Sequence, residues 1–130
     1  MKRRSYMKAM LAAVAGLKGA AAQGAKKPIV LNVDLSVDPA REQEMLHNFH
    51  TVFQPAATKF QGYIDVKILK LRTALQGAAA AGVNYRFQLT YESEELRRKW
   101  VSSDVHKKVW PTIENTLRSK GYTVLLFDSM

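Results

Sequence analysis

The stretch from Trp100 to Trp110, WVSSDVHKKVW, holds both tryptophans of the chain and one of its three histidines. An imidazole has an intrinsic pKa of about 6.5, which suits a general base at neutral pH. Two indole rings beside it would clamp a flat aromatic molecule. The same residues would also make the inner side of an ordinary helix, so the elements that position them must decide between the two interpretations.

Helical spacing turns His106 toward the interior of the protein. At about 100° per residue, an apolar arc runs along one side of this helix. The arc consists of Val105, Val109, Ile113 and Leu117. His106 falls inside the arc and Trp110 on its edge, so we expect the imidazole to face the sheet, near Tyr85 and Phe87. Two alternatives stay open: a core histidine bonded to a tyrosine hydroxyl or a carbonyl, or a base that faces a pocket.

The other two histidines, His47 and His50, lie three residues apart on a predicted helix. That spacing allows both to reach one metal ion. No carboxylate cluster completes a coordination sphere, so solvated side chains are the favoured interpretation and no metal is predicted. The chain has no cysteine, which excludes disulfides, thiolate metal sites and a thiol nucleophile.

The net charge of +9 is unevenly distributed along the chain. Residues 1–27 contain seven of the 20 basic residues and no acidic residue, whereas residues 28–130 contain 13 basic and 11 acidic residues. The body of the chain therefore lacks the basic stripe of a nucleic-acid-binding protein, and we expect no nucleic-acid partner.

Residues 1–27 have the three parts of an export signal. The basic segment KRRSYMK precedes the apolar run AMLAAVAGL, and Ala20-Ala21-Ala22 forms a small-residue cleavage site. The nine-residue run is shorter than the roughly 20 residues that span a bilayer, so no stable membrane span is expected. Arg3-Arg4 followed by Tyr6-Met7-Lys8 resembles a twin-arginine (Tat) signal, which implies export to the periplasm. A basic N-terminal arm is the alternative.

Residues 28–130 predict a single domain of strands and helices. Alternation of apolar and polar residues predicts strands at 29–37, 63–71, 83–91 and 122–128.

Two helical regions lie between these strands. Asp38 caps the first, which Gly62 ends and Pro55 interrupts with a kink or an early end. Ser93 caps the second, which breaks near residues 102–104 and ends at Gly121.

The resulting order, βαββαβ, predicts a ferredoxin-like α+β sandwich: an antiparallel four-stranded sheet with both helices on one face. The open face should carry Asn32, Asp34, Arg86 and Gln88. Such a face is either solvated or packs on a second copy around a two-fold axis, closing two sheets into a barrel. We expect Arg86 to form a salt bridge or a solvated surface there rather than to act in catalysis.

Within this frame, YESEELRRKWVSSDVH resembles the antibiotic biosynthesis monooxygenase (ABM) family. Its pattern is an aromatic-Glu-Ser at the end of the third strand, an acidic helix start, and Ser-x-x-His about a dozen residues on. Tyr91-Glu92-Ser93 and Ser103-Asp104-Val105-His106 match this pattern, and KFQGYID at 59–65 agrees with it as well. The resemblance covers about residues 28–128 and implies a dimeric α/β barrel.

The haem-degrading branch of that superfamily is a poor match. Its pattern requires an asparagine on the first strand, a tryptophan, and a histidine ten residues later. Trp100 fits, but Trp110 replaces the histidine. The asparagine position falls on Val33, and Asn32 is one residue off, which turns it to the other face of the sheet.

The resemblance favours a small oxidoreductase, a cofactor-independent monooxygenase acting on a quinol-like or phenolic compound. His106 would be the catalytic base, and Trp100, Trp110, Tyr85 and Phe87 would bind a small aromatic molecule as substrate. We expect a homodimer and no cofactor. The alternative is a non-enzymatic ligand-binding or structural dimer of the same fold; an open cavity at His106 favours the enzyme and a sealed core favours the alternative.

Overall fold

The computed structural model describes residues 27–130, so the predicted export signal lies outside the described residues. Their strands are β1 (Ile29–Leu35), β2 (Tyr63–Lys70), β3 (Tyr85–Tyr91) and β4 (Thr123–Asp128). Helical segments follow β1 and β3: first η3 (Pro39–Arg41), α3 (Glu42–Asn48), η4 (Phe49–Phe53) and α4 (Gln54–Thr58), then α5 (Glu94–Ser102), α6 (Asp104–Val109) and α7 (Pro111–Glu114). No helix in this part of the chain is long and apolar enough to cross a membrane.

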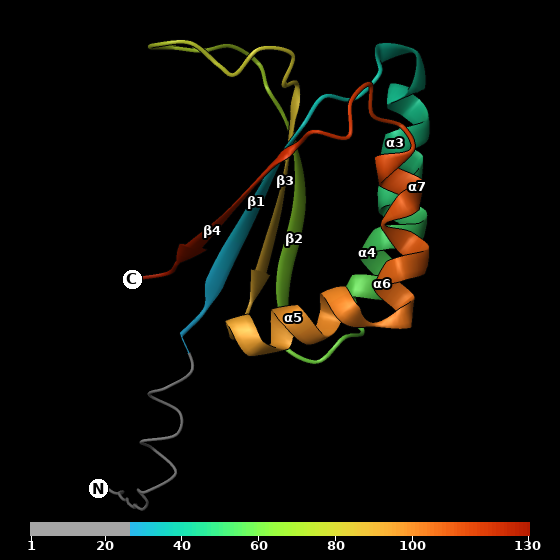
Figure 1. Cartoon of the computed structure of the whole chain (residues 1–130), viewed down its shortest axis with the longest axis vertical. Helices are drawn as coiled ribbons and strands as arrows, with labels where there is room; N and C mark the ends of the chain where they lie inside the picture. Colours follow the sequence, from blue (N-terminus) through green and yellow to red (C-terminus); the bar gives the residue numbers. More distant parts are fainter. Residues whose placement is uncertain (1–26) are drawn as a thin grey trace, which may run out of the picture.

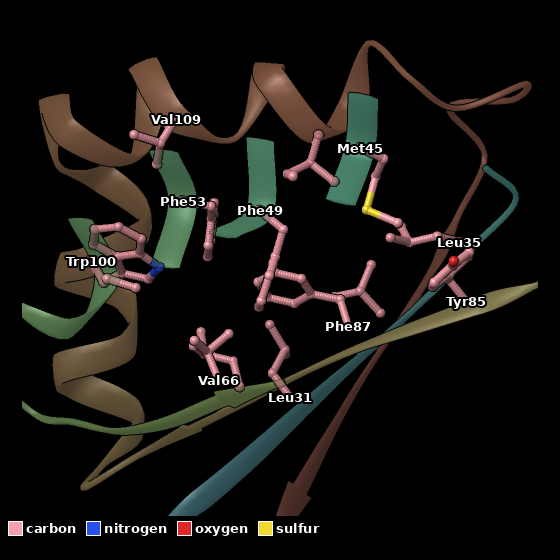
Figure 2. Close-up of a cluster of buried hydrophobic side chains, with 14 of the residues drawn as sticks. Leu31, Leu35, Met45, Phe49, Phe53, Val66, Tyr85, Phe87, Trp100 and Val109 are labelled. Atoms are coloured by element: carbon pink, nitrogen blue, oxygen red, sulfur yellow. The ribbon is translucent and has the colours of Figure 1, made fainter. Parts of the chain in front are cut away.

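The described strands form one antiparallel sheet in the order β2-β3-β1-β4. The helices of the described residues all lie on one side of it, and none of these residues covers the other side (Figure 1). This arrangement confirms the predicted ferredoxin-like sandwich. The core fills the space between the layers, where alternate residues of β1 and β3 meet Met45, Phe49 and Phe53 (Figure 2).

The first helical region begins as predicted and ends earlier. The Asp38 carboxylate accepts a hydrogen bond from the Ala40 amide at 2.9 Å and so caps the helix start. Pro55 does not stop the helix; the turn before it widens into the π-helix η4, and the chain continues as α4 to Thr58. Gly62 lies beyond the helix end, in the turn into β2, with a φ of 93°.

The second helical region breaks where predicted but ends at Glu114, so the prediction of a helix to Gly121 is wrong. Ser103 is extended (φ −74°, ψ 154°) and separates α5 from α6. Pro111 starts a further short helix, and the backbone of Leu117 then bridges to Val37. These breaks also overturn the continuous apolar arc, since Val105 is 44% exposed.

The open face of the sheet has the predicted composition. Arg86 forms a salt bridge with Asp34, its Nε lying 2.7 Å from Oδ1, and Gln88 donates to the Asn32 side chain at 3.0 Å. These polar groups satisfy one another in pairs across β1 and β3. Arg86 therefore has the salt-bridge role expected of it.

Candidate active site

His106 is positioned by the break between α5 and α6. The Ser103 hydroxyl accepts a hydrogen bond from the His106 amide at 3.2 Å and donates one to the Trp100 carbonyl at 2.6 Å. One side chain thus ends α5 and starts α6. The Ser-x-x-His pattern found in the sequence is therefore a helix cap that fixes where the imidazole sits relative to Trp100.

A cavity of about 180 Å³ lies between α5, α6 and the part of the sheet formed by β3, β1 and β4. Its wall is almost entirely apolar and includes Leu31 and Val33 of β1, Phe87 and Leu89 of β3, and Val124 of β4. Phe53, Trp100, His106 and Trp110 complete the wall on the helical side. The cavity is open to solvent, so His106 is not enclosed in a sealed core.

Aromatic rings surround the imidazole on the helical side. Trp110 lies nearly parallel to it, with ring centroids 6.2 Å apart and an interplanar angle of 14°. Trp100 meets it edge to face at 5.2 Å, and Phe53 does so at 6.4 Å. Figure 2 shows how Trp100 and Phe53 lie beside each other at this end of the core.

Neither ring nitrogen of His106 has a hydrogen-bond partner among the described residues; the hydrogen bonds of this residue are made by its backbone, from the amide to the Ser103 hydroxyl and to the carbonyl from the Trp110 amide. Among the described residues, no hydroxyl or carbonyl bonds to the imidazole, so the first alternative, a core histidine bonded in this way, does not apply. Burial lowers the pKa of the His106 imidazole, and the positive charge of Arg97 lowers it further. The imidazole is accordingly neutral at pH 7 and able to accept a proton.

The two tryptophans differ in their polar contacts. Trp110 donates its Nε1–H to the Tyr122 hydroxyl at 3.1 Å, and that hydroxyl donates to Glu114 at 2.9 Å. Trp100 is fully buried, and its Nε1–H has no partner among the described residues. A buried donor without a partner costs free energy, so this indole N–H is a polar group that the core leaves unsatisfied.

Tyr85 does not join this site, although we predicted that it would. Its side chain lies toward the other end of β3, where its hydroxyl donates to a Glu42 carboxylate oxygen at 2.5 Å. Burial is the larger cause and this hydrogen bond the smaller one, and together they raise the pKa of Tyr85 to about 12. Phe87, two residues on, is the β3 ring that packs against Trp110, at 5.6 Å. The prediction failed because one face of a strand spans about 6–7 Å per pair of residues, so residues on the same face can belong to different sites.

The sequence did not predict several residues of the cavity wall, among them Phe53, Arg97 and Tyr122. Phe53 reads as one more residue of an apolar stripe, and its place at the cavity depends on the π-turn of η4. Arg97 precedes Trp100 by three residues, which puts both on one side of α5. That three-residue spacing could have indicated from the sequence that Arg97 lies beside Trp100 in the cavity wall.

A second, larger cavity of about 470 Å³ lies beneath the loop between β2 and β3. Its charged residues include Arg86 and Asp34, which neutralise each other. Its wall contains no histidine and none of the buried polar atoms that lack partners in the described chain. The smaller cavity is therefore the better candidate for chemistry. No group of three metal-ligating side chains occurs within residues 27–130.

No protein-family model matches the sequence, and no curated protein matches it significantly. Solved structures do match the fold. A candidate antibiotic biosynthesis monooxygenase from Caulobacter crescentus superposes with a TM-score of 0.66 at 15% identity, over 81% of this chain and 92% of that one. A second candidate monooxygenase, from Nitrosomonas europaea, gives 0.62 at 10% identity, over 81% and 92%. A dimeric ferredoxin-like protein of unknown function from Jannaschia gives 0.63 at 13% identity, over 79% and 98%. The chain therefore has the ferredoxin-like fold that these proteins share.

Proposed function

We propose that the protein is a small ABM-type monooxygenase that oxidises a phenolic or quinol-like molecule without a cofactor. The observation that carries the proposal is an unpartnered, neutral imidazole in an open apolar cavity, next to an unpartnered buried indole N–H. The candidate monooxygenases among its structural neighbours support the proposal through the fold alone.

The chemistry begins with a proton transfer to His106. Molecular oxygen reacts slowly with closed-shell phenols, whereas a phenolate gives up an electron readily. For a phenol with a free ring position, one atom of O₂ enters the ring and the other leaves as water, which yields a quinone. The protein has to supply a base, an apolar site and aromatic walls, and His106, Phe87 and the two tryptophans provide them.

The cavity size narrows the substrate. An apolar cavity of about 150 Å³ holds benzene, so the 180 Å³ present here suits one substituted ring better than a polycycle. The Trp100 and Trp110 rings would pack against that ring, while His106 receives the proton of its hydroxyl group.

We also propose that the protein works as a homodimer, with the open sheet face against a second copy, and that residues 1–27 direct it to the periplasm. The dimeric ferredoxin-like neighbour supports the first point. The second point rests on the sequence of the N-terminal segment.

Replacing His106 tests the proposed reaction. In an oxygen electrode with substituted hydroquinones and phenols, His106→Ala should lower oxygen uptake by roughly 10²-fold, the usual scale for losing a general base. Its melting temperature should change little, because no hydrogen bond of the imidazole is lost. His47→Ala, at an exposed histidine of α3, should retain wild-type activity and serves as the matched control.

The alternative, a non-enzymatic ligand-binding dimer, makes the opposite prediction. Wild-type protein that binds phenols but consumes no oxygen with any of them would support the alternative. Equal activity in wild type and His106→Ala would remove His106 from the mechanism.

A further inference from the structure

Besides His106, the wall of the candidate active site contains a cation, Arg97. Its side chain is 18% exposed and comes from α5, one turn before Trp100. The remaining groups that face His106 carry no charge: Phe53 lies on η4, Leu31 and Val33 on β1, Phe87 and Leu89 on β3, and Tyr122 just before β4. Glu114 of α7 lies behind Tyr122 and accepts a hydrogen bond from its hydroxyl. Arg97 is therefore the charge that the cavity presents to a ligand.

The Arg97 guanidinium is held in place by Glu94. Its Nε lies 2.6 Å from Oε1 and its Nη2 lies 2.7 Å from Oε2, a two-point contact that fixes the plane of the group. Its third nitrogen, Nη1, has no hydrogen-bond partner among the described residues. The group is thus oriented on one side and free to donate on the other.

The carboxylate does not neutralise this cluster. Glu94 also accepts a hydrogen bond from Arg98 Nε, at 3.1 Å, so two guanidinium groups share one carboxylate. These hydrogen bonds, chiefly the one from Arg97, lower the pKa of Glu94 and keep it ionised. Arg98 is 73% exposed, so solvent screens its charge, whereas the Arg97 guanidinium adjoins the apolar cavity, where a charge acts more strongly than it would in water.

We propose that Arg97 is the anion-binding residue of this cavity, and that its Nη1 receives the negatively charged oxygen of a one-ring phenolate. The inference deepens the proposed function and rests on it. When His106 takes the ring hydroxyl proton, the O–H bond breaks, an N–H bond forms, and the electron pair stays on oxygen. The phenolate oxygen then lies opposite a fixed cation instead of unpaired in an apolar cavity, which would be unfavourable.

The same charge acts on the base. With burial as the larger cause, Arg97 lowers the pKa of His106, so the imidazole stays neutral to a lower pH. Arg97 therefore lowers the proton affinity of the donor and of the acceptor together. The difference between the two pKa values, which sets the equilibrium of the proton transfer, therefore changes less than it would if the charge acted on only one of the two groups.

The test is a spectroscopic titration that does not require turnover. The probe is 4-nitrophenol, whose phenolate absorbs visible light and whose ionisation falls near neutral pH. Bound to wild-type protein, it should ionise at lower pH than it does in buffer. Arg97→Gln should raise the pKa of the bound probe by about one unit, the lower end of the effect of a neighbouring charge. Arg97→Lys, which keeps the charge, should recover most of the difference.

Arg98→Gln is the matched control, since it removes an equal charge from a side chain that is 73% exposed. It should leave the pKa of the bound probe unchanged. Equal shifts in both variants, or a wild-type probe that ionises as in buffer, would overturn the inference. An Arg97-dependent shift in a protein that consumes no oxygen would uphold the anion site and overturn the proposed oxygenase. Failure of the probe to bind wild-type protein would overturn both.

Discussion

Two tyrosines on the inner face of β3 show how much the partner of a buried hydroxyl matters. Tyr85 and Tyr91 are both buried, but the Tyr85 hydroxyl donates to Glu42, whereas that of Tyr91 has no partner among the described residues. Burial accordingly raises the pKa of Tyr91 well above that of a free tyrosine. The Tyr91 hydroxyl is desolvated without compensation.

This difference predicts opposite effects for one chemical change. Tyr91→Phe removes an unsatisfied hydroxyl and should raise the free energy of unfolding by about 1 kcal/mol. Tyr85→Phe removes a satisfied one, leaves Glu42 with fewer donors, and should lower the free energy of unfolding. Urea unfolding of both variants beside wild type measures this, and a Tyr91→Phe protein that is clearly less stable would show that the hydroxyl has a partner.

At the residue scale, the sequence predicted which side chain faces inward but not what surrounds it. Helical periodicity correctly turned His106 and Trp110 toward the interior, because both lie in α6 or at its end. The same argument failed for Val105, because the Ser103 break restarts the helix just before it. The alternation of apolar and polar residues in β3 predicts which face a side chain is on but not how far along the strand it lies. Tyr85 was therefore assigned to the wrong site.

At the scale of elements, the turn between α4 and β2 depends on Gly62. Its φ of 93° lies in the region that other residues avoid, and an added Cβ would come within 2.7 Å of the Leu96 side chain on α5. The Gly62 carbonyl also accepts a hydrogen bond from the Glu92 amide at 2.8 Å. This glycine therefore lets the turn pack against the start of the helix that carries Arg97 and Trp100.

Alanine at this position should be costly for two separable reasons. Gly62→Ala should lower the free energy of unfolding by roughly 2–4 kcal/mol, through backbone strain plus steric overlap with Leu96. Gly77→Ala is the control: its φ is 73°, but an added Cβ meets nothing within 4 Å, so only the strain of about 1–2 kcal/mol should remain. Thermal unfolding of the pair measures the difference, and equal losses would mean that the Leu96 contact relaxes freely.

The elements themselves were predictable because local rules place them. Caps at Asp38 and Ser93 and alternation in the strands gave the order βαββαβ. The ends of the helices were less predictable, since proline effects depend on whether the neighbouring turn can widen, as η4 does before Pro55. The early end at Glu114 follows from backbone pairing of Leu117 with Val37, a contact between distant parts of the chain.

For the whole molecule, the most consequential surface is β4. It is the edge strand next to β1, and its residues Val124, Leu125, Leu126 and Phe127 are each about half exposed. In Figure 1 this strand lies on the side of the sheet away from the helical layer. Exposed apolar side chains of this kind supply contact area for a second chain packed on the open face, so they support the proposed homodimer.

The dimer can be tested directly by mass. Light scattering at micromolar concentration should give about twice the 14.6 kDa of the chain, or less if the N-terminal segment is removed. Phe127→Lys, on the open face of β4, should give a monomer because it places a charge in the contact. Val105→Lys, on a comparably exposed valine of α6, should remain dimeric.

A wild-type monomer across this concentration range would mean that the open face is simply solvated. The alternation of residues within each strand predicted which side chains lie on the open face of the sheet. It did not predict that β4 would be exposed on both of its faces. Exposure depends on how far the helices extend across the sheet, which no local pattern determines.

Both tryptophans of the chain lie in the wall of the candidate active site, and the sequence contains no other. Their ultraviolet emission therefore comes from the cavity alone, without background from the rest of the protein. A molecule that enters the cavity should change the intensity or the wavelength of that emission. Tryptophan fluorescence of the unlabelled protein therefore reports whether the cavity is occupied. A library of phenols can be screened in this way before any assay of turnover has been established.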